Sequence, residues 1–152
     1  IGTTQTLFFF FFQMHGIGLL ADCKITKVSG AVAAGTSSVN SSEIDMTGFE
    51  GVVFIGQYGT SAADNGLKAQ QDTSAADLEG TSVLLDGTET LSIVQVHKPR
   101  EQFVRAVAVR GTSSTLDSII AIQYGPRTAA VDNNASTDNA AESHVSPAEG
   151  TA

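Results

Sequence analysis

The chain has 152 residues, of which 41% are hydrophobic and 16% charged, and its formal net charge is -8. This length fits one domain and is enough to bury a core. The acidic charge argues against nucleic acid as a partner, because phosphate backbones repel it. The charged fraction is below the usual ~25%. Uncharged polar residues and Gly must form much of the surface, which favours an all-β protein with many turns or a surface largely covered by partners.

Five consecutive phenylalanines, Phe8 to Phe12, stand near the start of the chain. The apolar run that contains them, residues 7–12, is much shorter than the ~20 residues of a membrane-spanning helix. Residues 1–6 contain no Lys or Arg, which a secretion signal would have. We therefore expect neither a membrane span nor a secretion signal, and no membrane partner.

We predict that residues 1–20 form an N-terminal arm outside the folded domain. Two interpretations of its phenylalanine run stay open. The native product begins at Met14 and residues 1–13 are not native, or the run is an arm buried against a partner. A run of five exposed phenylalanines would promote aggregation, so an ordered run must be covered.

Short apolar runs of strand length follow, and turns rich in Gly, Ser and Thr separate them. β-branched and aromatic residues dominate these runs. Parallel strands would need long crossovers, so we expect antiparallel pairing over residues 21–125. Strands that are apolar on both faces fit the middle of a sandwich or a barrel. The predicted strands are residues 24–28, 52–55, 91–96, 103–110 and 118–124, with weaker candidates at residues 67–71 and 82–85.

The clearest local unit consists of residues 103–110 and 118–124, joined by GTSSTLD. We predict that these two runs form a hairpin at the centre of the core. No segment has helical periodicity over three turns. The segment TSAADLEG, residues 73–80, fits a short capped helix or a loop.

The composition changes after Tyr124. Residues 126–152 contain one basic and four acidic residues, and their apolar residues are mostly Ala. Such a segment cannot bury a core of its own. We predict an extended C-terminal tail, and we expect that a neighbouring subunit must hold it if it is ordered.

The residues that carry chemistry are sparse. Cys23 is the single cysteine, and with His15, His97 and His144 scattered along the chain it cannot build a zinc site. GIGLLA, residues 16–21, has the spacing of a dinucleotide-binding turn, but a strand rather than a long helix is predicted to follow it. No nucleophile stands beside a base. We expect no metal, no cofactor and no enzymatic activity.

The segment KPRE, residues 98–101, comes just before the strongest predicted strand. It fits a basic contact point for a partner, and it fits a solvated turn equally well. The candidate partner contacts of the chain are Lys98, Arg100, Arg127, His144, Val145 and Pro147.

Three segments carry a resemblance: LKAQQDTSAADLEGTSV (67–83), HKPREQFVRAVAVRGTSSTLDSIIAIQYGPR (97–127) and HVSPAEGTA (144–152). They resemble small virion proteins of tailed bacteriophages, in particular capsid decoration, or cement, proteins. The resemblance covers residues 46–152. It implies a jelly-roll β-sandwich on the outside of an icosahedral shell, bound to the major capsid protein, and a homotrimer at local three-fold positions.

Two alternatives remain beside a cement protein. A head–tail connector or tail component would have the same structural character but few copies per particle. A sugar-binding surface module would need exposed aromatic side chains, and the chain has no Trp and only Tyr58 and Tyr124 as tyrosines.

Overall fold

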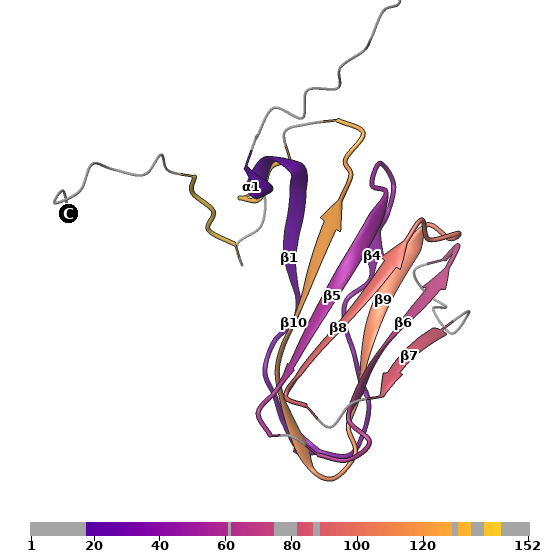
Figure 1. Ribbon diagram of the computed structural model, residues 1–152, viewed down its shortest axis with the longest axis vertical. Helices are drawn as coiled ribbons and strands as arrows, with labels where there is room; N and C mark the ends of the chain where they lie inside the picture. The colour runs from indigo at the N-terminus through magenta and orange to yellow at the C-terminus, as the bar shows by residue number, and fades with distance from the viewer. Residues whose placement is uncertain are drawn as a thin grey trace, which may run out of the picture.

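The computed structural model describes residues 18–60, 62–74, 82–86, 89–128, 131–134 and 139–143 (Figure 1). In this part of the chain two antiparallel sheets form a β-sandwich, which confirms the predicted all-β fold. The phenylalanine run, the main part of the predicted helix or loop at 73–80, and the candidate contacts His144, Val145 and Pro147 lie outside the described residues.

The first sheet, sheet A, is built around the order β1-β10-β5-β8, and β2 pairs with β10 at one end. All its pairs are antiparallel. A four-residue helix, α1 (Leu19–Asp22), leads into it. The strands of sheet A are β1 (Cys23–Ser29), β2 (Val32–Gly35), β5 (Gly51–Tyr58), β8 (Leu91–His97) and β10 (Ser114–Tyr124).

The second sheet, sheet B, has the order β3-β9-β6-β7, and β4 also pairs with β9. Figure 1 shows it beside sheet A, with β6 and β7 at the far side from β1. Its strands are β3 (Val39–Asn40), β4 (Ile44–Asp45), β6 (Gly66–Asp72), β7 (Ser82–Asp86) and β9 (Phe103–Val109).

The predicted hairpin is wrong. β9 lies in sheet B and β10 lies in sheet A, so the chain crosses from one sheet to the other at residues 110–113. Both strands have internal positions in their sheets, and each has one fully buried face. Two such faces bury more apolar surface when they meet across the core than when the strands lie edge to edge. The facing residues are Val104, Ala106 and Ala108 from β9, and Leu116, Ile119 and Ala121 from β10.

The crossing is held by a buried arginine. Arg110 is 7% exposed, and its guanidinium donates to the carbonyl oxygens of Ala33 at 2.6 Å, Ser37 at 2.7 Å and Ser114 at 3.1 Å. An arginine in or at the end of a strand usually pairs with a carboxylate or extends its charged group into solvent. Arg110 instead satisfies backbone oxygens, which ties β2 and the start of β10 to the end of β9.

The buried Tyr58 closes the same end of the sandwich. Its hydroxyl donates to the carbonyl oxygens of Gly66, at 2.5 Å, and Val109, at 3.0 Å, on the opposite sheet. Burial raises the pKa of Tyr58, and the hydrogen bond to Gly66 and the charge of Arg110 oppose that rise. This tyrosine therefore joins the two sheets and is not available to an external ligand.

The outer faces of the two sheets differ in chemistry. Leu91 and Ile93 are each 51% exposed on the outer face of sheet A, whereas Val94 and Val96 face the core. The strand registers line up aliphatic residues across this face: Ile25, Val53, Ile55, Leu91, Ile93, Ile120 and Ile122. The corresponding face of sheet B combines the apolar Phe103 and Val107 with more polar and charged residues: Asp45, Lys68, Gln70, Asp72 and Arg105.

Part of the C-terminal tail packs against its own chain. Asn133 is 7% exposed and its side chain bonds to backbone atoms of Leu20, Cys23 and Ile25. The expectation that a neighbouring subunit must hold the tail is therefore wrong for residues 131–134 and 139–143. Side-chain amides supply the hydrogen bonds that this Ala-rich segment could not obtain from a core.

Candidate functional site

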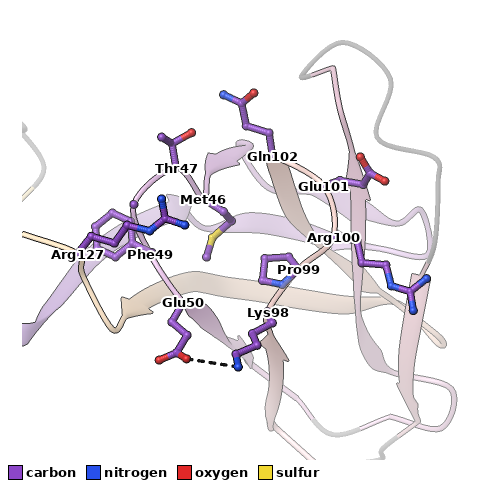
Figure 2. A pocket seen from close by; sticks show the side chains of 11 residues that line it. Met46, Thr47, Phe49, Glu50, Lys98, Pro99, Arg100, Glu101, Gln102 and Arg127 are labelled. Atoms are coloured by element: carbon purple, nitrogen blue, oxygen red, sulfur yellow. Dashed lines mark ion pairs between the residues drawn. The ribbon is translucent and has the colours of Figure 1, made fainter.

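A hollow of about 720 Å³ opens at the end of the sandwich opposite the Arg110 crossing (Figure 2). Its lining comes from three separate parts of the chain: residues 46–50 before β5, residues 98–102 between β8 and β9, and Arg127 after β10. The two sheets place these loops together, because β5, β8 and β10 are neighbours in sheet A.

Backbone hydrogen bonds fix the three loops to one another. The N–H of Met46 donates to the carbonyl of Gln102 at 2.8 Å. The N–H of Lys98 donates to the backbone carbonyl of Glu50 at 2.9 Å, and the N–H of Arg127 donates to the backbone carbonyl of Gly48 at 2.8 Å. The rim of the hollow is therefore a set of bonded turns, which favours a preformed binding surface.

The local chain geometry at the rim depends on two residues with positive φ. Gly48 has φ +87°, which glycine adopts readily, and Lys98 has φ 50°, in the left-handed region that is uncommon for other residues. The turn at Lys98 carries the chain from β8 toward Pro99 and directs residues 98–102 across the hollow.

Asp45 stabilises the first loop beside the hollow. Its carboxylate accepts the N–H of Thr47 at 2.8 Å and the side-chain amide of Gln102 at 3.2 Å. The hydrogen bonds from Thr47, with a smaller contribution from Gln102, hold the pKa of Asp45 below its ordinary value. The charged carboxylate thus links the loop before β5 to the loop before β9.

Three cationic residues line the hollow, and they differ in their contacts and in the direction of their side chains. Lys98 Nζ lies 3.8 Å from a carboxylate oxygen of Glu50, with side chains 69% and 50% exposed, so the pair is weak. Figure 2 shows the Arg100 side chain directed away from Pro99 and the interior of the hollow. Arg127 lies on the opposite side, near Phe49 (Figure 2).

The structure therefore brings together the three predicted contact residues that it describes: Lys98, Arg100 and Arg127 all line this hollow. The sequence reasoning missed the loop that faces them, residues 46–50. The sequence of this loop gives little indication of a site, because a turn glycine such as Gly48 before a buried strand is common in β proteins. Only the pairing of β5 with β8 and β10 shows that this loop belongs to the site.

A second cluster lies at the same end of sheet A, on its outer face. The rings of His97 and Tyr124 are stacked with centroids 6.2 Å apart and planes inclined by 4°. The Tyr124 hydroxyl accepts the side-chain amide of Gln95 at 2.6 Å and lies 3.0 Å from Nδ1 of His97. With Tyr58 buried, Tyr124 is the one tyrosine that could contact a sugar, and its hydroxyl is already engaged.

Cys23 is buried and free. Burial, with a smaller contribution from the carboxylate of Asp22, raises the pKa of its thiol, which disfavours the reactive thiolate. Within the described ranges, no group of three or more His, Cys, Asp or Glu could hold a metal ion. Nor does this part of the chain contain a helix with the length and apolar character needed to cross a membrane.

Comparisons with known proteins add little. No family model and no curated protein matches the chain. One solved structure that matches is a chain from work on Bacillus endospore appendages, described as a novel family of disulfide-linked pili. It is 11% identical, the match covers 68% of this chain and 88% of that chain, and the TM-score is 0.39. A similarity of this size supports no statement about function.

Proposed function

We propose that this chain is a non-enzymatic virion protein that binds the outside of an icosahedral phage capsid and stabilises it across the seams between capsomers. The observation that supports the proposal is that Lys98, Arg100 and Arg127, from two separate parts of the chain, all lie around one preformed hollow. The resemblance of residues 46–152 to decoration proteins supplies the partner, the major capsid protein. The same resemblance implies that the chain forms a homotrimer at local three-fold positions, that its sandwich has jelly-roll topology, and that it lies on the outside of the capsid.

The charge distribution favours an acidic or polar surface as the target of the hollow. The chain has eight Lys and Arg against sixteen Asp and Glu, so cations are scarce. Three of those eight line this hollow, against two of the sixteen acidic residues, Glu50 and Glu101. An arginine binds a carboxylate through two parallel hydrogen bonds, which gives both free energy and orientation. The exposed Lys98–Glu50 pair is weak enough to exchange for a partner's carboxylate.

The stabilising effect follows from mass action. A protein that binds only the closed shell adds its binding free energy to the stability of that shell. The internal pressure of packaged DNA acts to separate the capsomers, so a contact made across their seam opposes opening. Because one interface buries a limited area, the effect on the particle depends on many copies acting together.

The test uses capsids stripped of the protein and then incubated with purified chain. The variant K98E/R100E/R127E reverses three charges at the hollow, and K24E/K68E/R105E reverses three charges elsewhere on the sandwich. We expect the first variant to lose binding at least ten-fold and to leave capsids heat-sensitive. The second variant should bind like the unmodified chain. Circular dichroism melts of both variants verify that they are folded.

Quantitative mass spectrometry of the particles gives the copy number. A decoration protein is present in many copies per virion, whereas a head–tail connector or tail component is present in few copies arranged in a ring. Unchanged binding by the K98E/R100E/R127E variant contradicts the role of the hollow. A few copies per particle contradicts the cement function itself and favours the connector.

A further inference from the structure

Asn65 is the one asparagine of this chain that a glycine follows. Glycine has no Cβ, so its backbone nitrogen is unhindered and can attack the side-chain amide of the asparagine before it. In this reaction the nitrogen of Gly66 loses its proton and bonds to Cγ of Asn65, and the side-chain nitrogen leaves as ammonia. Water then opens the cyclic imide. The product is aspartate or isoaspartate, and in isoaspartate the main chain runs through the former side chain.

The side chain of Asn65 is buried in the folded protein, with a relative exposure of 0%. Its Oδ1 accepts the N–H of Gly111 at 3.1 Å and the hydroxyl of Ser114 at 3.0 Å. Its Nδ2 donates to the carbonyl of Thr60 at 3.3 Å. The side chain must give up all these hydrogen bonds before it can turn onto the nitrogen of Gly66. The fold therefore opposes the reaction through the position of the amide.

The backbone that carries the attacking nitrogen is fixed as well. Gly66 is the first residue of β6, and it pairs with Val109 of β9 and with Asp86 of β7. Its carbonyl accepts the hydroxyl of Tyr58 at 2.5 Å. Ring closure needs a rotation between Asn65 and Gly66, and this rotation would detach the start of β6 from its neighbours. The fold thus holds both reacting groups apart.

We propose that Asn65 is a deamidation site that the fold closes and unfolding opens. Both constraints depend on contacts with distant segments, so both disappear when the chain unfolds. Unfolded chains then lose ammonia at this position, whereas folded chains keep their asparagine. A chemical step of this kind makes unfolding irreversible. The site lies at the Arg110 crossing, opposite the basic hollow, so the inference does not depend on the proposed capsid binding.

The products do not fit the sandwich. Isoaspartate lengthens the main chain directly before β6, which displaces Gly66 from its partners in β7 and β9. Tyr58 joins the sheets through the carbonyls of Gly66 and Val109, so its hydrogen bonds are lost with this displacement. Aspartate keeps the length of the main chain, but it places a charge in a buried position and an oxygen opposite the carbonyl of Thr60. Isoaspartate should therefore prevent refolding, and aspartate should weaken the fold.

The experiment incubates the full chain at pH 8, with and without enough urea to unfold it, and follows Asn65 by peptide mass spectrometry. Chromatography separates the aspartate and isoaspartate peptides. We expect Asn65 to react at least ten-fold faster in urea than in the folded chain. Gly66→Ala is the matched control in urea, where its own folding has no influence. The added methyl group hinders the attacking nitrogen, so this variant should react at least five-fold more slowly than the unmodified chain.

Refolding tests the consequence of the reaction. Chains are held in urea for increasing times and diluted, and size exclusion separates native from non-native chains. Isoaspartate at position 65 should be at least ten-fold enriched in the non-native fraction. Asn65→Asp isolates the effect of the charge and should fold with a lower urea midpoint than the unmodified chain.

Three results would overturn the proposal. The first is an equal reaction rate of Asn65 in the folded and the unfolded chain, and the second is an unchanged rate in Gly66→Ala. The third is a native fraction that contains as much isoaspartate at position 65 as the non-native fraction does.

Discussion

Asn133 and Ile25 are 108 residues apart in the chain, yet the side chain of the first accepts the backbone N–H of the second at 2.7 Å. The same amide donates to the carbonyls of Leu20, at 2.7 Å, and Cys23, at 2.9 Å. One buried side chain thus connects the start of the C-terminal tail to the start of the sandwich, at the edge of sheet A.

Replacing Asn133 with Ala should release this part of the tail. The change leaves the N–H of Ile25 and two carbonyls without their partner, which we expect to lower the free energy of unfolding by ~1–3 kcal/mol. Urea denaturation measures the loss, and limited proteolysis should cut residues 128–143 faster. Asn40→Ala makes the same truncation at an exposed position and should change stability little. Equal effects of the two variants would contradict the anchoring role of Asn133.

Arg110 should matter far more for stability than Arg105. Replacing Arg110 with Met keeps the apolar stem but removes the donors to Ala33, Ser37 and Ser114, so we expect a loss on the order of 3 kcal/mol. Among the described residues, Arg105 makes one side-chain bond, from Nε to Oε1 of Gln70 at 2.9 Å, and Arg105→Met should cost about 1 kcal/mol or less. Thermal and urea unfolding of both variants compare the two losses. A similar loss for both means that the three carbonyls find other partners.

Stability should fall at alkaline pH because of Tyr58. Its pKa is raised above the ordinary value of 10.0 in the folded protein, so the folded state holds the phenol proton more tightly than the unfolded state does. This contribution is fully present below pH 10 and is lost as the pH rises through the folded pKa. Urea unfolding at pH 8 to 11.5 should show the decline.

Tyr58→Phe provides the matched comparison for that pH dependence. It should lower stability at neutral pH by ~1–3 kcal/mol, since the carbonyls of Gly66 and Val109 lose their donor. It should also flatten the part of the alkaline decline that comes from this phenol. An identical alkaline slope in both proteins would assign the decline to other groups.

A side chain at Gly51 should force the ring of Tyr124 to move, because this ring lies across the glycine. A Cβ at Gly51 would be 2.3 Å from Cζ of Tyr124. We expect Gly51→Ala to lower stability by ~1–3 kcal/mol and to displace the ring from His97, which near-UV circular dichroism can follow. Gly30→Ala is the control, because a Cβ there has nothing within 4 Å. A stable Gly51→Ala variant with an unchanged tyrosine signal would contradict this packing.

The strand content and the faces of the strands were predictable because they depend on local alternation. Leu91 and Ile93 point outward and Val94 points inward, as their spacing in the sequence indicates. The partner of each strand was not predictable in the same way. Residues 103–110 and 118–124 have the composition of a hairpin, and no local pattern distinguishes a turn within one sheet from a crossing between two.

The candidate site, too, was predictable from the sequence only in part. Lys98 and Arg100 stand next to Pro99 in a segment whose position just before a strand suggested a contact, and Arg127 was named with them. That the three share one hollow with Met46 and Phe49 depends on three loops that approach from different strands. Sequence distance carries no information on such an approach, because strand order sets it.

Local patterns are enough to predict an all-β protein, because period-two alternation and turn residues act over a few positions. Three features follow only from the packing of the whole chain: β9 and β10 lie in opposite sheets, Arg110 binds carbonyls, and the tail returns to Ile25. These features depend on which apolar faces meet and which buried backbone groups still need a partner, and both are settled only when distant segments pack together.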